Sequence, residues 1–146
     1  MLAVFGKVLF AVFSIIIAAA DIKTGKVPRL AFVIALPLFL VLALLQNETR
    51  LPMMVLAGAL LGLLVFLIAF FVSGKKLGLA DVWYSTLIGL VLGPWWWYAA
   101  MGCACVCGIV YILLSKRRKI PFIPLMAFGS FVMMIVAAII DAFMRS

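Results

Sequence analysis

The chain alternates between long apolar runs and short polar segments over nearly its whole length. The apolar runs cover residues 2–20, 30–45, 52–72, 81–114 and 120–143. A helix needs about 20 apolar residues to cross the roughly 30 Å hydrocarbon core of a bilayer. Most of these runs approach or exceed that length and carry almost no charge. The pattern therefore predicts an all-α bundle of transmembrane helices.

The run at 81–114 is too long for a single span, because one helix of that length would extend about 51 Å at 1.5 Å per residue. Gly93-Pro94 is the obvious break, since both residues interrupt helices. The aromatic residues 95–98 follow it, and such residues gather at the membrane–water boundary. We therefore predict two spans here, the first of them short, and about six spans in all.

The first run, 2–20, has some features of a cleavable signal peptide, with Lys7 near its start and three alanines at its end. It is longer than the apolar core of such signals, so we expect it to be a retained span. The whole chain, 1–146, is then expected to form a single transmembrane domain.

Composition supports a lipid environment. Hydrophobic residues make up 70% of the chain and the mean hydropathy is +1.43, which a short soluble domain could not shield from water. The net charge of +8 does not indicate a nucleic-acid partner, because the basic residues cluster in short loops between apolar runs. We expect the lipid bilayer to be the main partner, and no nucleic acid.

The basic residues also predict an orientation. With six spans, the loops 21–29, 73–80 and 115–119 fall on one side with nine basic residues, and the other side holds three. Positive loops favour the cytoplasm. We therefore expect both termini on the non-cytoplasmic side of the inner (cytoplasmic) membrane.

Two of only four acidic residues, Asp21 and Asp81, lie where apolar spans meet these basic loops. An ionisable residue at such a place is a candidate functional residue, although Asp81 alone would also suit a helix N-cap. The topology puts both at the cytoplasmic end. Two carboxylates that share a site share one proton, so one can activate water while the other donates a hydrogen bond to a carbonyl. The pair therefore predicts peptide hydrolysis without a cofactor.

Small residues surround each aspartate. Gly78 and Ala80 precede Asp81, and Gly25 follows Asp21, so an extended peptide backbone could approach closely. These three are candidate substrate-binding residues.

Other motifs are interpreted as structural. Cys103, Cys105 and Cys107 cannot all face one metal ion from a helix, and the chain has no histidine, so we predict no metal site. Six glycines on the third to fifth spans are expected to allow close helix packing: Gly58, Gly62, Gly89, Gly93, Gly102 and Gly108.

The motifs together resemble those of the prepilin peptidases, membrane aspartic proteases with a Gly-x-Gly-Asp motif. Residues 21–28 (DIKTGKVP) resemble the first motif, and 78–82 (GLADV) with Gly89 and Gly93 resemble the second. The stretch 121–124 (PFIP) is similar to the start of the last span in that family. The chain departs from the family pattern at Ala80, Arg29 and Trp83, and it lacks the large cytoplasmic loop with paired Cys-x-x-Cys motifs.

This resemblance implies a short, peptidase-only enzyme with Asp21 and Asp81 as the catalytic pair. Its substrates would be pilin-like precursors with a short basic leader, cut at the cytoplasmic face. The residues themselves leave open a non-enzymatic assembly scaffold or a small proton-coupled transporter component, in which the acid pair would relay protons.

Overall fold

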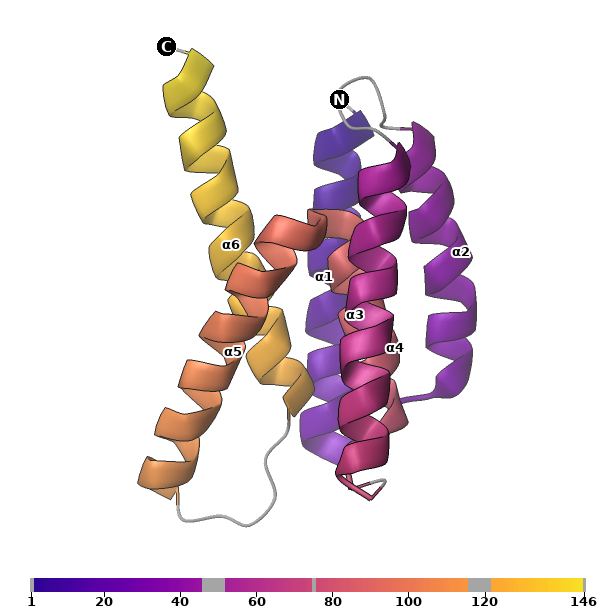
Figure 1. Ribbon diagram of the computed structural model, residues 1–146, viewed down its shortest axis with the longest axis vertical. Helices are drawn as coiled ribbons and strands as arrows, with labels where there is room; N and C mark the ends of the chain where they lie inside the picture. Colours follow the sequence, from indigo (N-terminus) through magenta and orange to yellow (C-terminus); the bar gives the residue numbers. More distant parts are fainter. Residues whose placement is uncertain (1, 46–51, 75, 116–121, 146) are drawn as a thin grey trace.

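The computed structural model describes residues 2–45, 52–74, 76–115 and 122–145. Within these ranges the chain forms six helices: α1 (Leu2–Thr24), α2 (Arg29–Leu45), α3 (Pro52–Val72), α4 (Leu79–Leu92), α5 (Pro94–Ser115) and α6 (Phe122–Arg145). Successive helices run in opposite directions, and both ends of the chain lie at the same end of the bundle (Figure 1). The all-α prediction is confirmed for the described residues.

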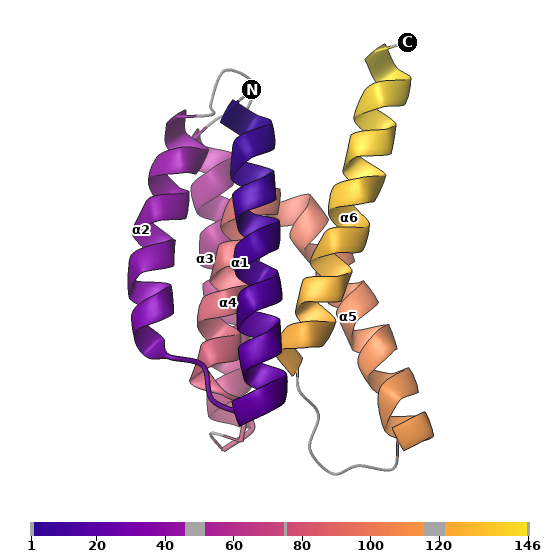
Figure 2. The same cartoon turned by 180° about the vertical axis from the view of Figure 1, so that it is seen from behind.

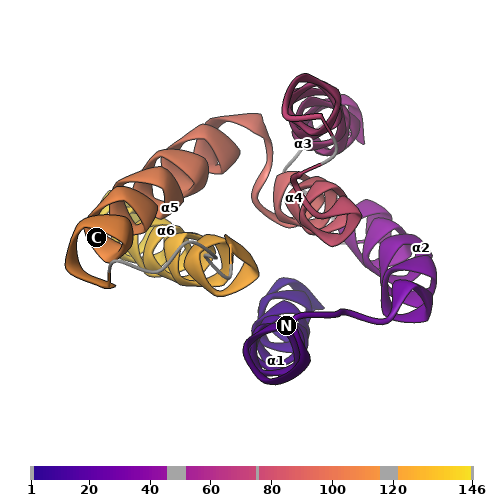
Figure 3. The same ribbon diagram turned by 90° about the horizontal axis from the view of Figure 1, so that it is seen from below.

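The helices form two groups. Helices α1 to α4 stand side by side, whereas α5 and α6 pack together and lean away from them (Figure 2). Viewed along the bundle, the α5–α6 pair lies to one side of the other four helices (Figure 3). Helix α4 contacts α2, α3, α5 and α6 and so occupies the centre.

Four helices in the described part of the chain are long and apolar enough to cross a membrane: α1, α3, α5 and α6. Helix α2, with 17 residues, and α4, with 14, are shorter. Many large apolar side chains point outward, such as Ile15 and Ile16 on α1 with 59% and 62% exposure. An apolar surface of this kind suits lipid rather than water. The structure therefore agrees with a multi-pass membrane protein that has one unusually short central helix.

The break between α4 and α5 lies at the predicted place. Gly93 adopts a φ of 82°, which favours glycine, and its N–H donates to the Gly89 carbonyl oxygen over 2.8 Å. Pro94 then begins α5, at a position where its missing N–H costs nothing. The chain reverses here because glycine ends one helix and proline starts the next.

Glycines bring α3 and α4 into backbone contact. A Cβ atom on either Gly58 or Gly89 would overlap the carbonyl oxygen of the other, and one on Gly62 would overlap the Ser85 carbonyl oxygen. Small residues at such crossings are typical of membrane helices. The packing prediction is confirmed for these three glycines. It is wrong for Gly102, where an added Cβ would meet nothing within 4 Å.

Buried hydrogen bonds join the same helices. The Trp97 indole donates to Ser85 Oγ over 3.0 Å, and Ser85 Oγ donates to the Gly62 carbonyl oxygen over 3.2 Å. Trp97 is 2% exposed, so it packs inside the protein and does not face the lipid interface as a residue of an aromatic belt would. Its neighbours Trp95 and Tyr98 are 77% and 55% exposed, as residues of an interfacial belt would be.

Candidate functional site

Asp21 lies in the last turn of α1. The sequence pattern ended the first span at residue 20, but the helix continues through Thr24, so Asp21 is helical rather than part of a loop. Gly25 follows with a φ of 61°, and its N–H donates to the Asp21 carbonyl oxygen over 2.8 Å. A glycine in the left-handed conformation is a common helix C-cap. The cap fixes the turn that carries the Asp21 side chain.

Asp81 lies in the first turn of α4, three residues after the N-cap residue Gly78. Its Oδ2 accepts a hydrogen bond from the Gly78 N–H over 3.1 Å. A carboxylate at this position also benefits from the positive end of the helix dipole. The side chain is 9% exposed, so Asp81 is a nearly buried acid whose orientation the start of the helix determines.

The structure places the two aspartates at the same end of the bundle, where α1 ends and α4 begins (Figure 1). The Asp21 carboxylate is close enough for its charge to act on Asp81. Asp21 is partly exposed and Asp81 nearly buried, and among the described residues no hydrogen bond joins the two carboxylates. Charge repulsion between them would be relieved by one shared proton.

The three candidate substrate-binding residues lie around this pair. Gly25 and Gly78 are exposed and Ala80 is partly exposed. An added Cβ would meet nothing within 4 Å at Gly25, and at Gly78 it would meet only the Asp81 carboxylate group. The surroundings of both glycines are therefore open to another chain, apart from the acid itself.

Exposed basic side chains mark the same end of the molecule. Those in the described residues are Lys23, Lys26, Arg29 and Lys76. Lys75, the cluster 116–119 and Pro121 lie outside the described residues, whereas Pro124 lies in the first turn of α6.

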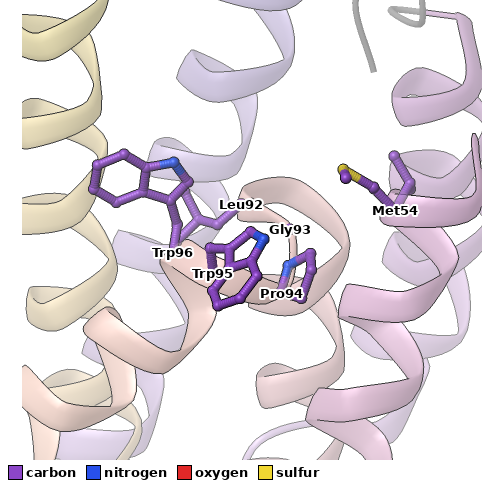
Figure 4. Close-up of a pocket in the computed structure, with 7 residues that line it drawn as sticks. Met54, Leu92, Gly93, Pro94, Trp95 and Trp96 are labelled. Carbon is purple, nitrogen blue, oxygen red and sulfur yellow. The ribbon is translucent and has the colours of Figure 1, made fainter. Parts of the chain in front are cut away.

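A pocket of about 200 Å³ lies at the opposite end of α4, and its lining includes Met54 of α3 and residues 92–96 (Figure 4). It is apolar and about 16 Å along α4 from Asp81.

The described residues contain no group of three or more potential metal-binding side chains of His, Cys, Asp or Glu, and the three cysteines are free thiols.

Comparison with known families favours the peptidase among the candidate classes. The model of the type IV leader peptidase family matches residues 8–113, which include both aspartates and all three small residues beside them. The chain belongs to this family. No match was found among curated proteins or solved structures. The matched residues cover α2 to α4 in full and most of α1 and α5. A leader peptidase hydrolyses a peptide bond.

Sequence reasoning missed three buried hydroxyls, those of Ser14, Tyr84 and Ser130, which lie on the helices that carry and support the two aspartates. Single serines and tyrosines in apolar runs give no signal of proximity. A helical projection would have shown that Ser14 lies on the same face of its helix as Asp21, and Tyr84 on the same face of its helix as Asp81.

Proposed function

We propose that this leader peptidase is an aspartic endopeptidase in which Asp21 and Asp81 form the catalytic pair, within one transmembrane domain over residues 1–146. The observation that carries the proposal is that a nearly buried carboxylate begins α4 at the same end of the bundle where α1 ends with a second carboxylate (Figure 1). Charged groups are costly in such surroundings, so an ionisable residue found there is a candidate functional residue. A leader peptidase requires a group that hydrolyses a peptide bond, and the two carboxylates can provide it.

The chemistry follows from one proton shared by two acids. The ionised carboxylate takes a proton from water as the water oxygen attacks the carbonyl carbon of the substrate, while the protonated acid donates a hydrogen bond to the carbonyl oxygen. Collapse of the tetrahedral intermediate breaks the C–N bond, and the leaving nitrogen takes up a proton from the pair. The Gly78 N–H orients the Asp81 carboxylate during these steps.

The substrates proposed are pilin-like precursors with a short basic leader and an apolar helix after the cleavage site. Such a helix can reach the pair from the lipid, and the open surroundings of Gly78 and Gly25 would admit its extended N-terminal segment. The exposed basic residues beside the aspartates favour the cytoplasmic face for this end, with both termini on the other side of the inner membrane.

The test is cleavage of a pilin-like precursor by the purified full chain in lipid nanodiscs, with products identified by mass. Asp21→Asn and Asp81→Asn keep the side-chain size but remove the acid. Each is expected to lower the cleavage rate by about 10²–10⁴-fold, since a positioned general acid or base contributes about that much.

Asp141→Asn is the matched control, because Asp141 is an exposed acid near the opposite end of α6. We expect this variant to cleave at the normal rate. Cleavage by either of the other two variants at a rate comparable to that of the unaltered protein would overturn the assignment of the pair.

A further inference from the structure

Three buried hydroxyl groups from three different helices meet in the core. Ser14 of α1, Tyr84 of α4 and Ser130 of α6 are each 0% exposed. The hydroxyls of Ser14 and Ser130 both lie near enough to that of Tyr84 to interact with it. In a chain with so few polar residues in its spans, this cluster requires an explanation.

The hydrogen bonds of the cluster are incomplete. Ser130 Oγ donates to the Ala127 carbonyl oxygen over 2.8 Å. Neither Ser14 Oγ nor the Tyr84 hydroxyl makes a hydrogen bond to another described residue. Buried polar groups without partners are rare, and they often mark functional or mobile sites. Since the Ser130 proton is already used, Ser130 can accept from Tyr84, and Tyr84 can then accept from Ser14. A small movement would complete a chain of donors across three helices.

This cluster lies on the faces that carry the aspartates. Ser14 precedes Asp21 by seven residues, two helical turns, and Tyr84 follows Asp81 by three, about one turn. An approach of Ser14 to Tyr84 would therefore also move Asp21 relative to Asp81, because a helix transmits such a shift along its length.

Tyr84 is also a direct link between the two catalytic helices. Helix α1 packs mainly on α6 and α2, and α4 packs mainly on α3 and α2, so α1 and α4 contact each other less extensively than they contact these neighbours. The Tyr84 ring nevertheless stacks on Phe10 of α1, with centroids 6.3 Å apart and planes at 11°. Its position allows it to control the spacing of α1 and α4.

We infer that Tyr84 is a positioning residue for the aspartate pair. Its hydroxyl accepts from Ser14 and donates to Ser130 when α1 approaches α4, and this chain fixes the separation at which the two carboxylates share a substrate. The inference rests on the proposed function and extends it by naming what sets the geometry of the pair.

The first test is Tyr84→Phe, which keeps the ring stacked on Phe10 and removes only the hydroxyl. The rate at saturating precursor is expected to fall at least about tenfold, because small displacements of reacting groups are costly. The half-saturating concentration and the thermal unfolding midpoint are expected to stay unchanged. Tyr98→Phe removes an exposed tyrosine hydroxyl and serves as the matched control, with normal cleavage expected.

A second measurement does not depend on activity. The three native cysteines are replaced by serine, Asp21→Cys and Asp81→Cys are introduced, and the rate of oxidative crosslinking between the two positions is compared with and without Tyr84→Phe. Slower crosslinking with Tyr84→Phe is expected, and Ser14→Ala should have the same effect. Slower crosslinking in either variant would support the inference that the hydroxyl chain sets the distance between positions 21 and 81.

The inference is overturned if Tyr84→Phe cleaves and crosslinks as the parent does, or if it loses activity only together with stability. The proposed function fails separately, if Asp21→Asn or Asp81→Asn still cleaves. If the aspartate variants are inactive and Tyr84→Phe is fully active, the catalytic role of the aspartate pair stands and the positioning role of Tyr84 is refuted.

Discussion

Replacing Gly78 with alanine should disturb the Asp81 carboxylate and little else. The backbone at Gly78 has a φ of −69° and a ψ of 137°, which alanine adopts without strain. An added Cβ would lie 3.1 Å from Asp81 Oδ2, and ordinary contact begins at 3.4 Å, so the carboxylate must retreat by about 0.3 Å. The hydrogen bond from the Gly78 N–H, now 3.1 Å, would lengthen correspondingly.

The expected magnitude follows from this displacement. A misplacement of 1 Å costs about 100-fold in rate, so a shift of about 0.3 Å with a weakened hydrogen bond should cost about three- to tenfold. Stability should change little, because the gain of about 0.4–1 kcal/mol from restricting the unfolded chain is offset by the poorer N-cap that alanine makes compared with glycine. The cleavage rate should therefore fall without a comparable change in stability.

The assay compares initial cleavage rates of a pilin-like precursor in nanodiscs with the thermal unfolding midpoint of the same preparation. Gly102→Ala is the matched control, since an added Cβ there meets nothing and α5 is already helical. It should leave cleavage unchanged. An unaltered rate in Gly78→Ala would show that the position of the Asp81 carboxylate does not limit the reaction.

Two further predictions concern the contact between α3 and α4. Gly89→Ala places a methyl group against the Gly58 carbonyl, so the helices must separate, and we expect a loss of about 1–3 kcal/mol in the free energy of unfolding, measured as a lower unfolding midpoint. A midpoint equal to that of the parent would refute the close contact. Ser85→Ala leaves the buried Trp97 indole N–H without its acceptor and should cost about 1–3 kcal/mol. Trp97→Phe combined with Ser85→Ala should recover part of that loss, and strictly additive losses would argue against the hydrogen bond.

The sequence predicted much of the fold because membrane helices leave a direct record in hydropathy. The bounds of α3 agree with the prediction, and the break at Gly93-Pro94 is confirmed. It could be predicted because Pro94 is the only proline in the run 81–114. The prediction failed at the end of α1, since a polar side chain such as Asp21 can extend a helix beyond the apolar run. The two aspartates were identified because charges are rare in such a chain.

Contacts between helices could not be predicted in the same way. Gly102 and Gly89 look alike in sequence, yet only Gly89 meets another backbone. Trp97 is two residues after Trp95 but points into the core, because two steps along a helix turn a side chain by about 200°. The Ser14, Tyr84 and Ser130 cluster depends on the relative rotation of three helices, which hydropathy does not encode.

The most direct test of the aspartate pair is a double-mutant cycle on the cleavage rate. Asp21→Asn, Asp81→Asn and the double variant are compared with the parent under single-turnover conditions. If the two acids act as one unit on a shared proton, the double variant should be no slower than either single variant, because each change already removes the whole function. A shared catalytic site would be contradicted if the losses in cleavage rate from the two single variants added up in the double variant. It would also be contradicted if the double variant cleaved at the rate of the parent.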